Sequence, residues 1–223
     1  MVHCVSLSNP FIYIERARCT ASMEEDREAW DELYRRQPRA WRGASKVPDL
    51  GLSAGSSVLD VGCGNGKTST ALMEMGFDVT GIDFSPGAVS SCEERLGDSA
   101  RFIVSDCTEM PFSDGTFDGI YAVHVTEHLD DDGLEKFASE CFRILRPGGR
   151  LYIRSVSPDD MRASEGDTVR NGISYRYRTP EEIASRFSIF VRGCLETVTD
   201  RTRFGTVRSR SECNFTKPDG LGP

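Results

Sequence analysis

Apolar runs and amphipathic stretches alternate along the middle of the chain. The apolar runs have the length of β-strands and occupy residues 57–61, 78–82, 101–104, 119–125 and 150–156. Stretches with helical periodicity lie between them, at residues 67–75, 85–96 and 134–145. Strands that alternate with helices at this spacing predict a doubly wound, mostly parallel α/β sheet, with its ligand at the C-terminal ends of the strands.

The pattern is different before residue 51. Ser22-Met23-Glu24-Glu25 resembles a capping box and predicts a helix to about Arg36, with Trp30 and Tyr34 on the same face. The aromatic residues from Trp30 to Trp41 either pack on the core or form part of a lid over a ligand. We therefore assign residues 1–50 to an N-terminal helical cap or lid segment, and residues 51–156 to the core.

The pattern changes again after residue 156. Residues 157–175 are polar and predict a loop, and Thr179-Pro180-Glu181-Glu182 predicts the capped start of a short helix. Two alternating runs, at residues 195–204 and 207–215, predict an antiparallel hairpin. The hairpin brings the expected sheet to seven strands. We therefore expect residues 157–223 to complete the same domain.

Composition adds a few constraints. A chain of 223 residues is long enough for one α/β domain with a short extension. The formal net charge of −8 gives no sign of a general nucleic-acid binder. Eight cysteines without a C-x-x-C pair are expected to be reduced thiols in a cytoplasmic protein, with no metal site. No apolar run has transmembrane length, so we expect no membrane partner, and residues 1–20 make a poor signal peptide.

A glycine-rich loop follows the first predicted strand, with the sequence Asp60-Val61-Gly62-Cys63-Gly64-Asn65-Gly66-Lys67-Thr68. Such a loop lets backbone N–H groups and a helix N-terminus approach a ligand closely. A P-loop needs four residues between its glycines, and counting back from Gly66 puts Val61 where the first glycine should be. A nicotinamide-binding loop needs its third glycine where Lys67 stands. Both interpretations are disfavoured, which leaves G-x-G-x-G preceded by an acid.

Five segments in order resemble the motifs of one family. They are the glycine loop, Val79-Thr80-Gly81-Ile82-Asp83-Phe84-Ser85, Ser105-Asp106-Cys107-Thr108-Glu109-Met110-Pro111-Phe112, residues 117–129, and Leu145-Arg146-Pro147-Gly148-Gly149. Together they resemble class I S-adenosylmethionine (SAM) dependent methyltransferases of the methyltransferase type 11-like kind. Cys107 and Met110 replace a usual alanine and leucine without a change in charge. The resemblance implies a Rossmann-like SAM methyltransferase fold, SAM as cofactor, and methyl-transfer activity.

The resemblance also implies which residues bind SAM. The glycine loop would lie against the methionine and ribose portions, Asp83 would accept the ribose hydroxyls, and Asp106 would accept the adenine amine. Asp60 would order the loop or reach the amino group of SAM. The expected cofactor-binding residues are Asp60, Gly62, Cys63, Gly64, Gly66, Asp83, Phe84, Ser85, Asp106, Cys107, Val123 and His124.

The run His124-Val125-Thr126-Glu127-His128 spells H-x-x-E-H, the inverted zinc-protease motif. That motif needs a helix, whereas this run leaves an apolar strand, and the only other histidine is His3. A metalloprotease is therefore disfavoured. In the resembling family this stretch lies beside the methyl group. His124 and His128 are candidate catalytic residues that could deprotonate an acceptor, and a structural hydrogen bond is the alternative for each.

The acceptor is the part of the function that the sequence describes least. A small molecule is the leading expectation. The alternative is a tRNA- or RNA-modifying enzyme, because Arg201, Arg203, Arg208 and Arg210 follow the predicted hairpin, where a basic face could contact phosphate. A solvated hairpin face interleaved with acids would explain the same arginines. A protein acceptor and a non-catalytic SAM-fold binding protein are lesser alternatives, and the sequence indicates no oligomeric state.

Overall fold

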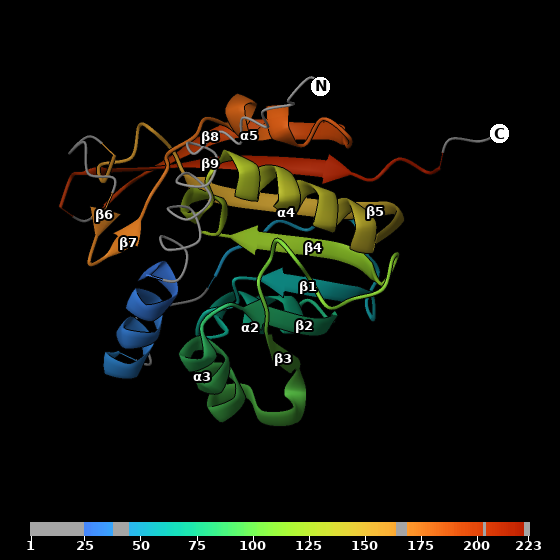
Figure 1. Ribbon diagram of the computed structural model, residues 1–223. Helices are drawn as coiled ribbons and strands as arrows, with labels where there is room; N and C mark the ends of the chain where they lie inside the picture. The colour runs from blue at the N-terminus through green and yellow to red at the C-terminus, as the bar shows by residue number, and fades with distance from the viewer. Residues whose placement is uncertain (1–24, 38–44, 164–168, 203, 221–223) are drawn as a thin grey trace, which may run out of the picture.

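The computed structural model describes residues 25–37, 45–163, 169–202 and 204–220. Seven strands form one sheet in the order β3-β2-β1-β4-β5-β9-β8 (Figure 1). Their bounds are β1 Ser57–Val61, β2 Asp78–Asp83, β3 Arg101–Val104, β4 Phe117–Val123, β5 Leu145–Val156, β8 Val191–Arg201 and β9 Val207–Thr216. Strands β1 to β5 pair in parallel, whereas β9 runs antiparallel between β5 and β8. The predicted fold class, including the C-terminal hairpin, is confirmed.

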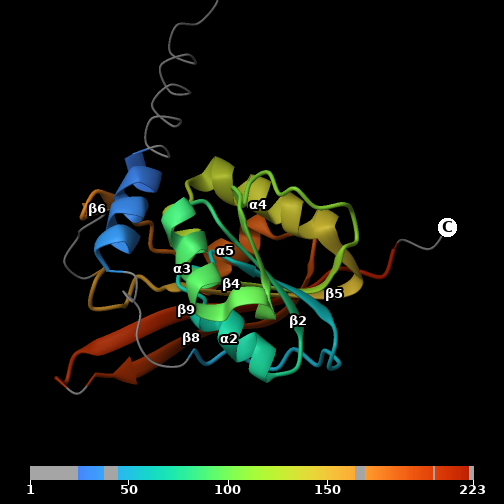
Figure 2. The ribbon, with the colours of Figure 1, turned by 90° about the horizontal axis from the view of Figure 1, so that it is seen from below.

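Helices cover both faces of this sheet. They are α2 Lys67–Glu74, α3 Pro86–Leu96, α4 Asp131–Ile144 and α5 Pro180–Arg186, with the 3-10 helices η1 Gly97–Ser99 and η2 Thr126–His128 and a helix over residues 25–36. Successive strand residues point to opposite faces. Ile120 therefore joins the apolar cluster with α4 and α5, while Tyr121 joins the cluster with Leu72 of α2. Figure 2 shows α4 and α2 on opposite sides of the sheet.

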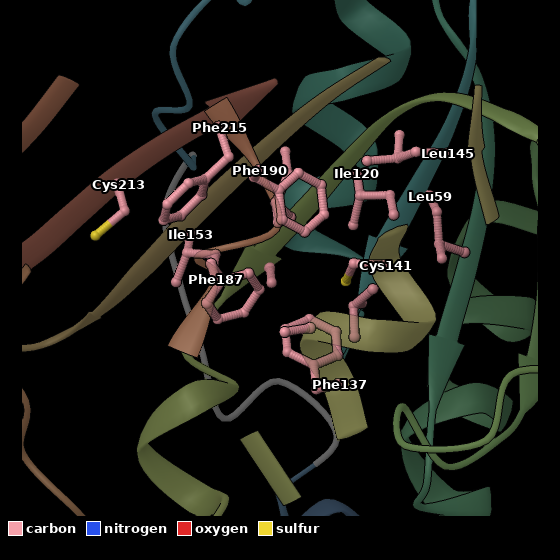
Figure 3. Close-up of a cluster of buried hydrophobic side chains, with 14 of the residues drawn as sticks. Leu59, Ile120, Phe137, Cys141, Leu145, Ile153, Phe187, Phe190, Cys213 and Phe215 are labelled. Atoms are coloured by element: carbon pink, nitrogen blue, oxygen red, sulfur yellow. The ribbon is translucent and has the colours of Figure 1, made fainter. Parts of the chain in front are cut away.

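The larger apolar cluster joins the C-terminal segment to the central strands (Figure 3). The rings of Phe137 in α4 and Phe187 have centroids 6.0 Å apart, and Phe187 stacks on Phe215 of β9 at 5.2 Å. Burial of such side chains contributes about 25 cal/mol per Å² of apolar surface. The hairpin and α5 therefore share the core of the parallel strands, which fixes β9 at the side of the site.

The helix over residues 25–36 is attached to the start of α3. The carboxylate of Asp31 accepts hydrogen bonds from Ser85 Oγ and, at 3.1 Å, from the backbone N–H of Gly87. Tyr34 is buried, and Trp30 is half-buried on the same face, as predicted. The capping box that begins at Ser22 lies outside the described residues, as does Trp41.

Several element boundaries differ from the prediction. β4 begins at Phe117 rather than at residue 119, β5 begins at Leu145 rather than at residue 150, and β8 covers Val191–Arg201 rather than residues 195–204. β4 ends at Val123 rather than at residue 125, because His124 adopts a left-handed backbone with φ 64° that stops strand pairing. α4 begins at Asp131 rather than at Leu134, because the side chain of Asp130 accepts a hydrogen bond from Gly133 N at 2.8 Å and caps the helix earlier.

The C-terminal segment contains one element that the sequence did not predict. The expected loop over residues 157–175 includes a short ribbon of β6 Val169–Arg170 and β7 Ile173–Ser174. Its turn uses Asn171 and Gly172 with φ values of 53° and 80°. The capping box of Thr179 and Glu182 at the start of α5 is present as predicted. Within the described ranges, no helix combines the length and apolar character needed to cross a membrane.

Candidate active site

A cavity of about 690 Å³ lies at the C-terminal ends of the central strands. Cavities of this size hold small organic ligands and cofactors. Its wall contains ten of the expected site residues, namely Gly62, Cys63, Gly64, Asp83, Phe84, Asp106, Cys107, Val123, His124 and His128. Asp60, Gly66 and Ser85 lie outside this wall.

The glycine loop has a backbone that only glycine adopts easily. Gly62, Gly64 and Gly66 have φ values of 67°, 55° and 74°. A Cβ atom added to Gly62 would lie 2.6 Å from Cγ2 of Val125, and one added to Gly64 would lie 2.6 Å from the hydroxyl of Tyr34. The loop therefore needs glycine for its conformation and for its close contacts on the cavity side. Gly66 is also the N-cap of α2, whose first N–H groups face the loop.

Two thiols support the loop from behind. The sulfur atoms of Cys63 and Cys92 lie 3.8 Å apart in the buried region between the loop and α3. Cys92 also contacts the carbonyl oxygen of Gly64 at 3.2 Å. The hydrogen bond to Cys92 and burial raise the pKa of Cys63 well above its usual range. Cys63 is therefore a protonated packing residue whose backbone contributes to the cavity wall.

Asp83 connects the end of β2 to the glycine loop. Its Oδ2 atom accepts the backbone N–H of Gly64 at 2.9 Å, and its Oδ1 atom accepts the N–H of Ser85 at 3.0 Å. Burial raises the pKa of Asp83 to about 6, against the lowering effect of these two hydrogen bonds. Ser85 in turn caps α3, since its hydroxyl accepts Ala88 N at 3.1 Å. Each carboxylate oxygen of Asp83 has a further lone pair available for a ligand.

Two other acids follow neighbouring strands. Asp60 is buried at the end of β1, where its carboxylate accepts the hydroxyl of Ser69 at 2.6 Å. Burial raises the pKa of Asp60 to about 7. Asp106 follows β3 in the cavity wall, and its Oδ1 atom accepts both the N–H and the hydroxyl of Thr108, at 2.7 and 2.8 Å. The structure thus brings Asp83 and Asp106 to one cavity, with Asp60 beneath the loop.

His124 and Glu127 form a pair at the end of β4. Nδ1 of His124 lies 2.8 Å from Oε1 of Glu127, whose Oε2 atom accepts the hydroxyl of Ser155 at 3.0 Å. Burial acts to raise the pKa of Glu127, but His124 and His128 lower it to about 2. The ionised carboxylate can only accept hydrogen bonds, so Nδ1 of His124 donates, and in the neutral ring Nε2 carries the lone pair. Sequence reasoning missed this role for Glu127, which stood out only as part of a metal-type motif.

His128 has a different environment. Its Nδ1 atom donates to the carbonyl oxygen of Ser174 at 2.9 Å. The imidazole makes edge contacts with Trp30 and Tyr175, at centroid distances of 5.2 and 4.8 Å. These three rings form an aromatic section of the cavity wall. Among the described residues there is no group of three side chains that could hold a metal ion.

The hairpin arginines contribute to the same cavity. Arg208 and Arg210 lie on one face, as predicted, and both line the wall, where they form ion pairs with Asp160 at 2.9 Å and Asp200 at 2.7 Å. Arg201 is exposed, and Arg203 lies outside the part of the chain that the structure describes. Sequence reasoning also missed Arg154 and Arg162, which line the wall but belong to no recognised motif. For Arg154 the available signal was a charge inside the apolar run 150–156.

The central part of the chain is similar to known methyltransferases. A family model described as "Methyltransferase domain" matches residues 59–153. The chain is 37% identical over 125 residues to 2-methyl-6-phytyl-1,4-hydroquinone methyltransferase of Synechocystis sp., a match that covers 55% of this chain and 37% of the relative. It is 37% identical over 129 residues to demethylmenaquinone methyltransferase of Beutenbergia cavernae, covering 57% and 51%. These matches span about half or less of the length of the curated relatives.

Solved structures show the same fold. A SAM-dependent methyltransferase of Methanosarcina mazei superposes with a TM-score of 0.65 at 22% identity, and the alignment covers 76% of this chain and 95% of that chain. At this identity the likeness concerns the fold, which is the Rossmann-like sheet that the family resemblance implied. Residues 59–153 of this chain are therefore similar to the methyltransferase domain family, and the chain has the fold of SAM-dependent methyltransferases.

Proposed function

We propose that this chain transfers the methyl group of SAM to a small-molecule acceptor. One observation carries the proposal: a single cavity joins the glycine loop and the acids after β2 and β3 to a histidine whose free ring nitrogen can act as a base. The relatives named above are methyltransferases of a hydroquinone and of demethylmenaquinone, which are small molecules. The assignment of the individual site residues is part of this proposal.

The cofactor end of the cavity fits SAM by its chemistry. Gly62 and Gly64 keep the loop backbone left-handed and close to Val125 and Tyr34, and the methionine and ribose portions would lie against this backbone. Asp83, ionised above a pH of about 6, presents two carboxylate oxygens to a ribose diol. Asp106 presents an acceptor for the adenine amine, beside Phe84, which can cover the ring. When bound, SAM supplies an electrophilic methyl group on a sulfonium that is a good leaving group.

His124 is the proposed general base. Glu127 fixes the tautomer and the orientation of the ring, because the buried carboxylate accepts Nδ1–H. Nε2 can then take a proton from an acceptor hydroxyl or amine while that atom attacks the methyl group. The left-handed φ of 64° at His124 is a strained conformation of the kind found at functional sites. Glu127 is a positioning residue in this scheme.

Calorimetric titration with SAM, followed by transfer of labelled methyl from SAM into fractionated small molecules, RNA and protein, tests the proposal. We expect SAM to bind and label to enter a small molecule. His124→Ala is expected to lower the transfer rate by roughly 10²- to 10⁴-fold, the usual contribution of a general base. Its SAM affinity is expected to stay unchanged, because only the backbone of His124 is proposed to touch SAM. Absence of SAM binding by the folded chain would overturn the proposal.

The RNA alternative rests on the hairpin arginines. Arg208 and Arg210 face the cavity in ion pairs with acids, an arrangement that favours a small acceptor over an open phosphate-binding groove. Label that enters RNA in the same assay would select this alternative.

We also propose a reducing, cytoplasmic location, which is supported by the free thiols of all six cysteines in the described ranges.

A further inference from the structure

One part of the cavity wall has no role in the scheme above. It consists of Arg162, which follows β5, and Arg208 of β9, and we call it the arginine corner. In the sheet order, β2 and β3 lead to the acids of the proposed cofactor site and lie on one side of β1 and β4. Strands β5 and β9 lie on the other side. The arginine corner is therefore on the acceptor side of the cavity.

A single buried carboxylate organises both arginines. Asp160 is fully buried, and its Oδ1 atom accepts the backbone N–H of Arg162 at 3.0 Å. Its Oδ2 atom accepts Nε–H of Arg208 at 2.9 Å and the N–H of Ser209 at 2.8 Å. Burial acts to raise the pKa of Asp160, but these hydrogen bonds and Arg208 lower it. Asp160 thus stays ionised and fixes the loop that carries Arg162 against β9.

The arginine corner keeps donors that Asp160 does not use. Asp160 takes only Nε–H of Arg208, and in the described ranges no hydrogen bond joins the two Nη groups of Arg208 or the guanidinium of Arg162 to an acceptor. The side chain of Arg208 is only 22% exposed, and Arg162 is half-buried. Burial and the nearby charge of Arg208 both lower the pKa of Arg162. The two guanidinium groups thus keep several unused N–H donors, and among the described residues the only hydrogen bond between either of them and a carboxylate is that of Arg208 Nε to Asp160.

The surroundings of the arginine corner connect it to the proposed base. Arg162 lines the same cavity as Glu127 and Tyr175. Glu127 holds His124, and Tyr175 belongs to the aromatic section with His128. A ligand whose anionic group sits at the arginine corner would therefore share one cavity with the aromatic section and His124. Guanidinium groups bind carboxylates and phosphates in paired hydrogen bonds and with charge assistance.

We propose that the arginine corner binds an anionic group of the acceptor, a carboxylate or a phosphate, and so fixes the acceptor with its nucleophilic atom toward His124. The acceptor class is then a small acid with an aromatic or otherwise apolar body. This inference rests on the proposed function, since it names the substrate class of the same cavity.

The test uses matched probes on the full chain. Benzoate and phenyl phosphate carry the two candidate anions on one ring, and benzamide is the neutral counterpart of benzoate. Each is titrated by calorimetry in a buffer free of phosphate and sulfate, with and without S-adenosylhomocysteine. We expect at least one anionic probe to bind roughly tenfold more tightly than benzamide, and the tighter of the two identifies the group. Equal affinity for the anionic and neutral probes would overturn the inference.

Variants locate the binding. Arg162→Gln and Arg208→Gln are each expected to weaken binding of the anionic probe by roughly tenfold and to leave benzamide unchanged. Arg162→Lys keeps the charge but loses the paired geometry, and an intermediate loss is expected. Arg192→Gln, at an exposed position of β8 outside the cavity wall, is the matched control. Urea unfolding of each variant shows that it is folded, and anion binding unaffected by both cavity substitutions would contradict the proposal.

The outcomes separate this inference from the proposed function. Failure of wild-type protein to bind SAM would overturn the proposed function, while the titrations without S-adenosylhomocysteine still decide whether the arginine corner binds anions. Unchanged affinity of Arg162→Gln for S-adenosylhomocysteine would support an acceptor subsite. A clear loss of that affinity would mean that Arg162 serves the cofactor's own carboxylate, and the inference would be wrong.

Discussion

Replacing Asp60 by Asn tests whether the buried charge of Asp60 lowers the stability of the folded chain. Asp60 is 1% exposed at the end of β1, and its carboxylate accepts the hydroxyl of Ser69. Burial raises the pKa of Asp60 from its ordinary value of 3.8 to about 7. The folded chain therefore holds a proton at pH 5 or 6 that the unfolded chain has already lost. Asn is nearly isosteric and keeps an oxygen for Ser69, but it cannot ionise.

The size of the effect follows from the shift in pKa. One pKa unit corresponds to about 1.4 kcal/mol, so the rise from 3.8 to about 7 makes ionised Asp60 destabilising by at most about 4 kcal/mol. Because the pKa is raised in the folded state, the contribution of Asp60 to stability is fully present below pH 3.8 and is lost as the pH rises to about 7. Asp60→Asn is thus expected to raise the free energy of unfolding by about 1–4 kcal/mol at pH 8 and by little near pH 4.

Urea unfolding of wild type and variant at several pH values between 4 and 8 measures this difference. Asp78→Asn, at the exposed start of β2, is a control for the loss of a carboxylate without burial. A gain for Asp60→Asn that does not grow with pH, or a loss of stability at pH 8, would refute the reasoning. If the charge of Asp60 orders the loop or reaches the amino group of SAM, the same variant binds SAM more weakly while being more stable.

Three other predictions concern the cofactor end. Asp83→Ala is expected to weaken SAM binding by about 1–3 kcal/mol in calorimetry, because the ribose acceptor is lost and Gly64 N–H loses its partner; unchanged affinity would remove Asp83 from this role. SAM affinity of wild type is expected to fall as the pH drops below about 6, where Asp83 takes up a proton, and a flat profile between pH 5 and 7 would contradict this. In urea unfolding, Gly64→Ala is expected to lower the free energy of unfolding by about 1–2 kcal/mol because residue 64 has a left-handed backbone. The close contact of the new Cβ atom with Tyr34 is expected to lower it further. Combining Gly64→Ala with Tyr34→Phe is expected to recover the stability lost through the Tyr34 contact. No recovery would show that this contact does not contribute to the loss.

The elements with local signals were predictable from the sequence. β1, β2 and β3 follow apolar runs bounded by glycine or acids, and α3 follows the Ser85-Pro86 cap, so their bounds agree closely with the prediction. The end of β4 was not predictable in this way. Val125 continues the apolar alternation, but the backbone conformation of the single residue His124 ends the strand, and a hydrophobic pattern carries no information on it.

The residues of the acceptor side depend on contacts between distant segments. Alternation placed Arg208 and Arg210 on one face, but only the pairing of β9 with β5 turns that face toward the cavity. Glu127 holds His124 through local spacing, yet its burial and its bond to Ser155 come from β5. Arg162 joins the wall because Asp160 bonds to β9 across the fold. Such roles follow from tertiary structure, which no single stretch of sequence specifies.

The two thiols behind the glycine loop have a consequence for oxidation. Their sulfur atoms, 3.8 Å apart, could form a disulfide after a small movement, which would pull Cys63 toward α3 and distort the cavity wall. The thiolate is the species that attacks in such chemistry, and the raised pKa of Cys63 keeps its thiol protonated in the folded state. Loss of ligand binding under mild oxidants is therefore expected to be slower than oxidation of the exposed thiol of Cys194.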